Sequence, residues 1–191
     1  QSKVYGNFLE KLTARVSALV VGPASDSKSQ IGPMINAKAI AKIEEHVNDA
    51  VARGARVMAG GKRLFTEQRA ESTYYAPTVL ADVDRAAKCF HEETFGPVAP
   101  ITQFDTEEEV IKMANDSPFG LAAYFYTNDM RRVHRVTDAL ECGIVGVNEG
   151  ALAAEAAPFG GVKDSGYGRE GSVHGLAEYM HIKYVCQGGL D

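Results

Sequence analysis

The sequence predicts an α/β protein in which helices cover both faces of a mostly parallel sheet. Short apolar runs alternate with amphipathic stretches, in the rhythm that strand-helix-strand crossovers produce. In addition, residues 144–147 are free of polar side chains, as a strand buried on both faces of a parallel sheet requires. Residues 1–175 are expected to form one domain, and residues 176–191 a separate tail.

Two helices are predicted in the first third of the chain. Over residues 3–20, apolar side chains recur every three to four positions, which is typical of an amphipathic helix. Its inward face would comprise Val4, Phe8, Leu12, Val16 and Leu19. Gly22-Pro23 ends this helix, and after a loop Asn36 suits the N-cap of a second helix that stops at Gly54. The inward positions of the second helix would be Ile40, Ile43, Val47 and Val51.

Strands and one polar excursion are predicted in the middle of the chain. Residues 55–59 indicate a short strand, and the polar residues 62–72 indicate an excursion without regular structure. Aromatic and β-branched residues at 75–79, and the apolar run 98–104, predict two further strands. Residues 91–97 connect these two strands.

The same alternation continues to the tail. A capping box that starts at Thr106 begins a helix to about Asn115, a strand follows at 121–126, and Asn128 caps a helix over 129–141. After the strand at 144–147 and a glycine-rich loop, a short helix is expected to reach Tyr179.

The last predicted strand, residues 181–186, has no crossover left to bury it. A strand with a free edge pairs with another chain. The tail is therefore expected to join copies of the protein into a homo-oligomer, a dimer or a tetramer.

Composition argues against several classes of protein. The net charge of −5 and the pI near 5.6 oppose a nucleic-acid surface, which needs clustered Lys and Arg. No apolar run reaches about eighteen residues, so no membrane span is expected. Cys89, Cys142 and Cys186 lack the spacing of a disulfide framework or a metal site, which predicts a reducing, intracellular compartment and no bound metal. The chain begins at Gln1 rather than Met, so we expect its natural start to lie upstream.

Residues 91–97 are the first candidate for a functional site, because connections between buried elements are where sites are built. They combine two carboxylates, Glu92 and Glu93, with the ring of Phe95 and a Gly-Pro turn. In one interpretation the carboxylates form a solvated edge and Phe95 anchors the core. In the other, one carboxylate and the ring face a cofactor. Periodicity does not choose between them.

Two other motifs invite a functional interpretation. Residues 166–171 match GxGxxG, but this dinucleotide fingerprint needs a strand that leads into a helix, and residues 158–165 predict a loop. Tight binding of NAD by residues 166–171 is the alternative. Cys89 and His91 could pair as thiolate and base, yet no third group orients the base, so a buried, inert Cys89 is favoured.

Four motifs, in their order and spacing, resemble the aldehyde dehydrogenase superfamily over essentially the whole chain. They are E-E-T-F-G-P from Glu92, N-D-S-P-F-G-L from Asn115, G-I-V-G-V-N from Gly143 and P-F-G-G-V-K-D-S-G-Y-G-R-E-G from Pro158. The resemblance implies the catalytic-domain fold of that family. E-G at Glu149, G-R-E-G-S at Gly168 and I-K-Y-V-C at Ile182 are most similar to the succinate-semialdehyde dehydrogenase branch.

The resemblance implies that NAD or NADP oxidises an aldehyde to an acid: a cysteine thiolate attacks the carbonyl, hydride leaves to the nicotinamide, and a glutamate activates water. By position in the motifs, Glu93 would hold the hydroxyls of the nicotinamide ribose and Phe95 would pack beside the nicotinamide. Phe159 would line the aldehyde tunnel. Glu170 would relay a proton to the general base, and Arg169 would be structural.

The chain also departs from the family's pattern. The family's nucleophile lies in a G-Q-x-C type motif, and neither this motif, the general-base glutamate nor the dinucleotide-binding domain is in these 191 residues. The isolated chain is therefore expected to be inactive. Ala153 stands where the succinate-semialdehyde branch has a serine, and losing that hydrogen bond to a buried carboxylate would cost roughly 1–3 kcal/mol. Another semialdehyde or an uncharged aldehyde thus stays open as the substrate.

The sequence leaves open the choice of cofactor, the location of the protein and whether it is catalytic. The missing domain would decide between NAD and NADP. The expected location is the cytoplasm of a bacterium or the mitochondrial matrix of a eukaryote. The alternative from another class is a non-catalytic interaction or oligomerisation module on the same scaffold.

Overall fold

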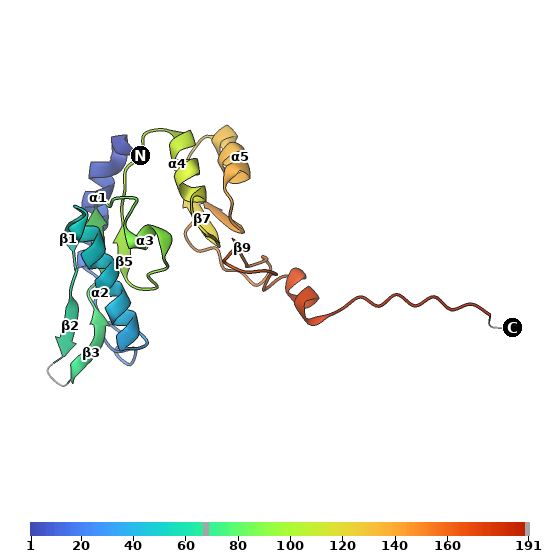
Figure 1. The fold of residues 1–191 in the computed structure, drawn as a ribbon, viewed down its shortest axis with the longest axis horizontal. Coiled ribbons are helices and arrows are strands. Elements are labelled where there is room, and N and C mark those ends of the chain that lie inside the picture. Colours follow the sequence, from blue (N-terminus) through green and yellow to red (C-terminus); the bar gives the residue numbers. More distant parts are fainter. Residues whose placement is uncertain (67–68, 190–191) are drawn as a thin grey trace. The chain divides into compact units, whose positions relative to one another are not determined.

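The computed structural model describes residues 1–66 and 69–189, which divide into two compact units, unit 1 (residues 1–106) and unit 2 (residues 107–191). Figure 1 labels the helices and strands of each unit. The boundary predicted at residue 175 stays a prediction.

Unit 1 contains a three-stranded sheet with the order β1-β4-β5 and a separate β2-β3 hairpin. β4 runs antiparallel to β1 and parallel to β5. The elements are α1 (Ser2–Ser17), α2 (Ala37–Ala52), β1 (Arg56–Ala59), β2 (Arg63–Thr66), β3 (Arg69–Tyr75), β4 (Thr78–Ala81), α3 (Lys88–His91) and β5 (Val98–Pro100). As predicted, Asn36 caps α2, its Oδ1 accepting a hydrogen bond of 3.0 Å from the Ala39 amide. Gly54 follows α2 with a φ of 101°, also as predicted.

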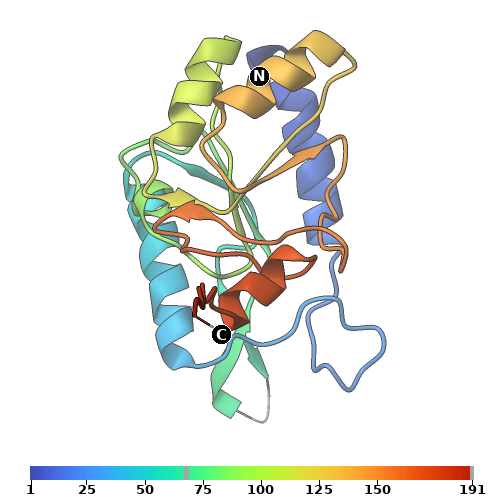
Figure 2. The same ribbon diagram turned by 90° about the vertical axis from the view of Figure 1, so that its right-hand side faces the viewer.

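β4 is buried at all four positions and separates two hydrophobic clusters. Val79 and Ala81 pack with Tyr5 and Leu9 of α1, whereas Leu80 packs with the buried face of α2. Because side chains alternate across a strand, α1 and α2 cover opposite faces of β4. Figure 2 shows the two helices on either side of the strands of unit 1. The predicted cover of helices on both faces is therefore observed at this strand.

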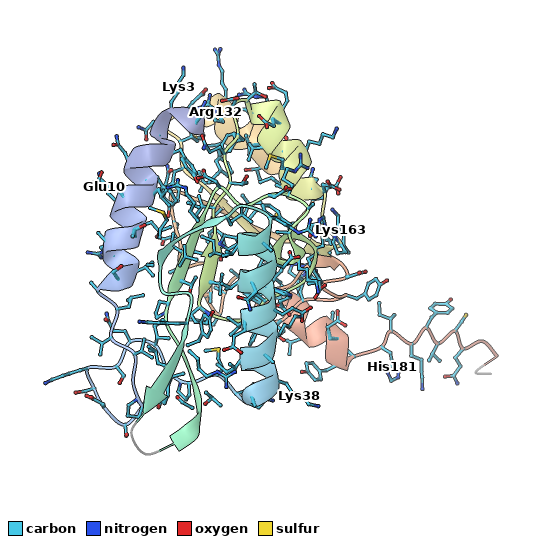
Figure 3. The ribbon with its side chains drawn as sticks, turned by 60° about the vertical axis from the view of Figure 1, so that its left-hand side comes forward. Lys3, Glu10, Lys38, Arg132, Lys163 and His181 are labelled. Atoms are coloured by element: carbon cyan, nitrogen blue, oxygen red, sulfur yellow. The ribbon has the colours of Figure 1, made fainter. Side chains whose placement is uncertain are left out.

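The predicted inward face of the first helix is correct at Leu12 and Val16, which pack against a buried cluster, and wrong in the first half of the helix. Val4 and Phe8 are exposed, and Tyr5 and Leu9 are buried instead. Apolar residues occupy both diagonals of this helix, and the Tyr5 hydroxyl decides between them by donating to Asp82 Oδ1 at 2.9 Å. In Figure 3, Lys3 and Glu10 project from the solvent side of α1. The second helix shows a similar shift at its end, where Ala50 is buried and Val51 is exposed.

The prediction of a mostly parallel sheet is wrong. The polar residues 62–72 contribute to the antiparallel β2-β3 hairpin rather than to an irregular excursion. A hairpin between β1 and β4 reverses the chain without a crossover, so β4 runs antiparallel to β1. Only β4-β5 and β7-β8 are parallel among the described pairs, and the sheets are small and mixed. The strands themselves are also displaced, since β4 covers 78–81 where 75–79 was predicted.

Unit 2 contains two small two-stranded sheets, in which β7 and β8 are parallel and β6 and β9 are antiparallel. The elements are α4 (Glu107–Asn115), β6 (Phe119–Gly120), β7 (Ala122–Phe125), α5 (Met130–Ala139), β8 (Ile144–Val147), β9 (Val162–Lys163) and the 3-10 helix η1 (His174–Tyr179). α4 begins directly after Thr106, where the capping box predicted it. Glu107 joins α4 to α5 by accepting from Arg132 Nε at 2.7 Å and Arg135 Nε at 2.6 Å.

The predicted N-cap of α5 is wrong. Asp129, not Asn128, caps α5, and its carboxylate accepts from the amides of Arg131 at 2.9 Å and Arg132 at 3.4 Å. A charged acceptor suits the positive end of the helix better than an amide oxygen. Residues 181–186 have no partner strand among the described residues, and their expected pairing with another copy of the chain stays a prediction. His181 projects from this extended tail in Figure 3. In the part of the chain that the structure describes, no helix is long and apolar enough to cross a membrane.

Candidate functional site

Loop 92–97 joins α3 to β5 and carries two residues expected at a cofactor, Glu93 and Phe95. Both line a hollow of about 430 Å³. The other lining residues are Pro33, Met34, Ile35, Ala39, Lys42 and Thr94. Phe95 is 83% exposed, so it does not anchor the core. The Glu93 carboxylate has no hydrogen-bond or ion-pair partner among the described residues. An unpaired carboxylate beside an exposed ring is an arrangement suited to a bound ligand.

The backbone of loop 92–97 is held in an unusual conformation. Phe95 has a φ of 44°, and a left-handed non-glycine residue costs roughly 1–3 kcal/mol, which the surrounding structure must offset. Next to it, a Cβ on Gly96 would collide with Ile43 Cδ1, so only glycine fits without displacing Ile43. The Pro97 carbonyl then accepts from the Thr78 amide at 2.8 Å, which ties the loop to β4.

A buried histidine of α2 also contacts this loop. His46 is fully buried, its Nδ1 lies 2.9 Å from Thr94 Oγ1, and its Nε2 lies 3.3 Å from Glu92 Oε2. His46 was not among the residues that the sequence motifs singled out. Its position three residues after Ile43, on the apolar face of α2, was the available signal. Lys42, which lines the hollow, was missed for lack of any signal.

The other two motif residues, Phe159 and Glu170, face each other in unit 2. The Phe159 amide donates to the Glu170 carbonyl at 2.8 Å, and the Glu170 amide donates to the Phe159 carbonyl at 2.7 Å. Residues paired in this way carry their side chains on the same face of the ladder. Both line a hollow of about 220 Å³ together with Leu121, Gly160, Gly161, Ser165, Tyr167, Gly168, Arg169 and Glu178. Arg169 Nη1 donates to two backbone carbonyls, Gly161 O at 2.8 Å and Gly168 O at 2.6 Å, in line with a structural role.

The GxGxxG match belongs to this pair and not to a strand-helix junction. Residues 166–171 lead back to the Phe159–Glu170 bridge, and Gly166, Gly168 and Gly171 have positive φ angles. Helix η1 begins only at His174 and is a 3-10 helix, so the geometry of the dinucleotide fingerprint is not formed here.

Ala153 lies in the loop between β8 and Pro158 and lines none of the hollows described above. The start of this loop is tied by Glu149, whose Oε1 accepts from the amides of Gly150 at 2.8 Å and Ala151 at 2.9 Å. The amides of Ala151 and Gly150 lower the pKa of Glu149. Ala153 therefore does not line the hollow that Phe159 and Glu170 share.

The three cysteines lie in three different surroundings. Cys89 is half-buried, and desolvation raises the pKa of its thiol. Its neighbour His91 places Nε2 2.9 Å from the Arg85 carbonyl oxygen rather than against the thiol. Cys142 donates to the Ile144 carbonyl at 3.3 Å, and Cys186 lies exposed in the tail. The inert interpretation of Cys89 is thus favoured.

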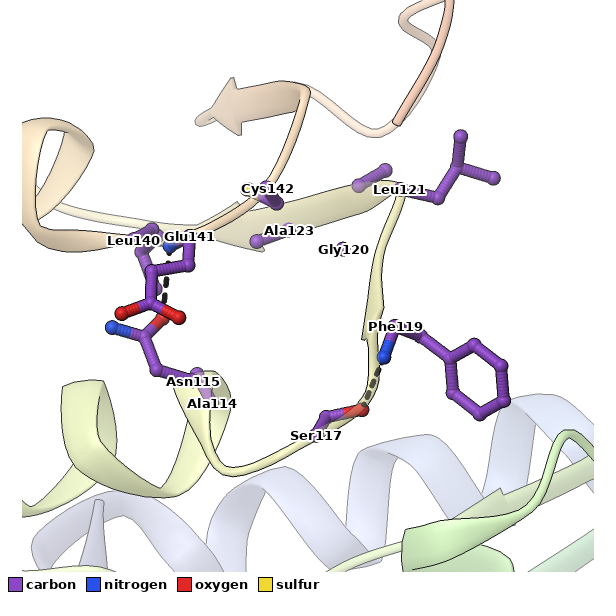
Figure 4. Close-up of a pocket in the computed structure, with 11 residues that line it drawn as sticks. Ala114, Asn115, Ser117, Phe119, Gly120, Leu121, Ala123, Leu140, Glu141 and Cys142 are labelled. Carbon is purple, nitrogen blue, oxygen red and sulfur yellow. Dashed lines mark hydrogen bonds between the residues drawn. The ribbon is translucent and has the colours of Figure 1, made fainter. Parts of the chain in front are cut away.

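A further hollow of about 270 Å³ lies between α4, β7 and the start of β8 (Figure 4). Its polar groups pair with each other: the Asn115 side chain donates to the Ala139 carbonyl at 2.8 Å and accepts from the Glu141 amide at 2.9 Å. Lys163 Nζ donates to the Asn115 carbonyl at 2.8 Å and lies 2.6 Å from the Glu141 carboxylate. This hollow is a structural junction with its hydrogen bonds satisfied.

Comparison with known proteins shows which family shares this sequence. A sequence model of the aldehyde dehydrogenase family matches residues 1–185. The chain is 52% identical over 190 residues to a probable succinate-semialdehyde dehydrogenase (NADP+) of Sinorhizobium fredii, covering 100% of this chain and 38% of that protein. It is 50% identical to a glutarate-semialdehyde dehydrogenase of Pseudomonas putida, covering 97% of this chain and 38% of that protein.

The fold is shared as well as the sequence. The crystal structure of succinate-semialdehyde dehydrogenase from Burkholderia pseudomallei matches with a TM-score of 0.90 at 50% identity, over 96% of this chain and 37% of that chain. The chain thus spans about 38% of the length of the relatives it matches.

Proposed function

Since this chain belongs to the aldehyde dehydrogenase family, we propose that it is part of an NAD(P)+-dependent dehydrogenase that oxidises a semialdehyde to the carboxylic acid. The relatives are named for succinate and glutarate semialdehyde. Succinate semialdehyde is the first candidate substrate, and glutarate semialdehyde the second.

The observation that carries the proposal is the pairing of Glu93 and Phe95 over one hollow. A free carboxylate accepts two hydrogen bonds from a ribose diol, and an exposed ring packs against a nicotinamide and excludes water from it. The residues present therefore fit a dinucleotide at this position. When bound, NAD(P)+ would accept a hydride from the substrate. Glu93 would orient the ribose and Phe95 would cover the ring.

Phe159 and Glu170 would act on the substrate side. Their backbone pairing holds the two side chains on one face, where the ring of Phe159 would line the path of the aldehyde. The exposed carboxylate of Glu170 would accept a proton released to solvent during turnover. Ala153 is proposed as a contact to the far end of the substrate. Because its methyl group cannot donate a hydrogen bond, glutarate semialdehyde and uncharged aldehydes are the competing substrates.

The first experiment is expression of the complete gene that encodes these residues, followed by assay of NADH or NADPH formation. We expect kcat/KM for succinate semialdehyde to exceed that for butyraldehyde by at least about tenfold, equivalent to 1.4 kcal/mol. Equal values for the two aldehydes would refute recognition of a distal carboxylate. A higher value for glutarate semialdehyde would reassign the substrate within the same reaction class.

The role of Glu93 has its own test. Glu93→Gln should raise KM for the cofactor about tenfold while leaving KM for the aldehyde nearly unchanged, because a charge-assisted hydrogen bond is replaced by a neutral one. Glu10→Gln, on the solvent face of α1, is the matched control and should leave both constants unchanged. An unaltered cofactor KM in Glu93→Gln would remove Glu93 from the site.

The tail is proposed to join subunits. Ile182 and Tyr184 are fully exposed and alternate in an extended segment without a partner strand among the described residues. An extended segment of this kind adds to the sheet edge of another copy. In the complete protein, Ile182→Asp with Tyr184→Asp should convert a dimer or tetramer to smaller species in light scattering. An unchanged mass would place the interface elsewhere.

We expect the isolated 191-residue chain to be catalytically inactive, because the family's nucleophile motif, general-base glutamate and dinucleotide-binding domain are not among these residues. Calorimetric titration of this chain with NAD and NADP tests the alternative that residues 166–171 form a complete dinucleotide site, which predicts tight binding. If the complete gene encoded an inactive protein, a non-catalytic oligomerisation module would be favoured. For the source of the protein we propose a bacterial cytoplasm or a mitochondrial matrix.

A further inference from the structure

His46 connects helix α2 to the loop that carries Glu93 and Phe95. The ring is fully buried, and each of its nitrogens has a partner in the loop: Thr94 Oγ1 at 2.9 Å and Glu92 Oε2 at 3.3 Å. A buried imidazole needs both nitrogens satisfied, and here a single loop satisfies both. In the neutral ring, Nε2–H donates to the Glu92 carboxylate and Nδ1 accepts from the Thr94 hydroxyl.

The loop distributes its side chains between His46 and the hollow. Glu92 is extended, with a φ of −127° and a ψ of 141°, and successive side chains of an extended segment point to opposite sides. Glu92 and the Thr94 hydroxyl contact His46, whereas Glu93 and Phe95 line the hollow, which Thr94 also borders. The two pairs share one short backbone, so a shift of the first pair moves the second.

Helix α2 holds the loop at two neighbouring points. Ile43, one turn before His46, packs against Gly96, where even a methyl group would collide with it. Ile40, Ile43 and Val47 belong to the buried cluster that fixes α2 against Leu80. The helix is thus a rigid support, and His46 transmits its position to residues 92–94.

We propose that His46 is a positioning residue for cofactor binding: through Thr94 and Glu92 it fixes where Glu93 and Phe95 meet NAD(P)+. This inference rests on the proposed function, which assigns those two residues to the cofactor. The competing interpretation is a core histidine that only stabilises unit 1. The two interpretations predict faster amide exchange in different residues when the ring is removed.

Hydrogen-deuterium exchange on the 191-residue chain separates the two interpretations without any cofactor. In His46→Leu we expect the amides of residues 92–96 to exchange about tenfold faster, while α2 keeps its protection. Val47→Ala is the matched control, because it weakens the same helix at a buried position that makes no hydrogen bond to the loop. If His46→Leu altered exchange only within α2, as Val47→Ala should, the positioning role would be overturned.

Cofactor binding is then measured on the complete protein by calorimetry. His46→Leu should raise Kd for NAD(P)+ about tenfold, as expected for two lost hydrogen bonds that order a site. KM for the aldehyde should change by less than about threefold. His46→Asn can replace the contact of Nδ1 with Thr94, and His46→Gln the contact of Nε2 with Glu92. Partial rescue by either variant supports the proposal.

The outcomes distinguish the two levels of inference. A wild-type protein that binds no NAD(P)+ would overturn the proposed function, and the cofactor role of His46 with it. Tight binding in the wild type together with an unchanged Kd in His46→Leu would overturn the role of His46 alone. Thr94→Val adds an independent check, since it removes only the hydroxyl and should reproduce part of the loss.

Discussion

Units 1 and 2 each carry a pair of proposed site residues, Glu93 with Phe95 and Phe159 with Glu170, but they hold these pairs by different means. Among the described residues, every buried apolar side chain except Val136 lies in unit 1. Loop 92–97 of unit 1 is fixed by side chains from that core, through Ile43 and His46. The Phe159–Glu170 pair of unit 2 is fixed by two backbone hydrogen bonds.

This contrast separates two ways of building a site. Where packing holds a site residue, its position depends on the size of the core side chains. Where backbone hydrogen bonds hold it, its position does not depend on the identity of the paired side chains. Exposed large apolar side chains are also frequent at the end of unit 2, for example Leu176, Tyr179, Ile182 and Tyr184. Exposed apolar surface of this kind supports the proposal that a partner binds there.

The largest effect should come from the core of unit 1. Ile43→Ala removes a fully buried side chain and should lower the free energy of unfolding by roughly 2–5 kcal/mol. Leu121→Ala in unit 2 removes a side chain that is 41% exposed and should cost less than about 1 kcal/mol. Urea unfolding followed by circular dichroism suits a chain without tryptophan. Equal losses for the two variants would contradict the contrast between the units.

Two glycine-to-alanine variants compare the cost of a collision with the backbone with the cost of a collision with a side chain. A Cβ on Gly143 would collide with the Gly160 carbonyl oxygen, which the backbone cannot easily move. On Gly96 it would meet the flexible end of Ile43. We expect Gly143→Ala to cost about 3 kcal/mol and Gly96→Ala about 1 kcal/mol, the two ends of the range for overpacking. Thermal melts of both variants test the order, and the reverse order would refute this assignment.

The apolar tail should determine how the isolated chain associates. Ile182→Ser with Tyr184→Ser should raise the self-association Kd about tenfold or more, because two exposed apolar side chains lose their burial in the assembly. Sedimentation velocity at several concentrations measures it. Val4→Ser with Phe8→Ser, on the exposed face of α1, is the control in unit 1. A larger effect in the control would indicate that the association surface lies in unit 1.

The smallest effect should be the acid response of the α4–α5 contact. Arg135 and then Arg132 lower the pKa of Glu107 to about 2, below its ordinary value of 4.5. A depressed carboxyl pKa contributes stability above the unfolded value, and this contribution is lost as pH falls from 4.5 towards 2. The stability difference between wild type and Glu107→Gln should therefore shrink over this range. Denaturant titrations at stepped pH measure it, and a difference that grew on acidification would give the wrong sign.

The sequence predicted well those features that depend on neighbouring residues. The cap at Asn36, the left-handed Gly54 and the start of α4 after Thr106 each rest on contacts within a few positions. The prediction of the inward face was wrong in the first half of α1, because Asp82, the partner of Tyr5, lies 77 residues away. The predicted strand direction was wrong for a similar reason, since the β2-β3 hairpin forms through pairing of its strands and not through local polarity.

The candidate site shows the same limit. Motif resemblance selected Glu93 and Phe95, but periodicity could not say that the ring is exposed and the carboxylate unpaired. His46 was missed because its partners, Glu92 and Thr94, lie 46 and 48 residues further along the chain. A histidine on an otherwise apolar helix face is a usable signal, because burial of such a ring requires partners from another segment.

The bridge between Phe159 and Glu170 also bears on how such a protein can diversify. Its two hydrogen bonds join main-chain atoms, so either side chain can be exchanged while the bridge itself stays closed. Substitutions at positions 159 and 170, natural or designed, can therefore alter the lining of the hollow with little risk to folding. Glu92, Thr94 and Gly96 of loop 92–97 offer no such freedom, because a change at any of them must also satisfy the helix that packs against it.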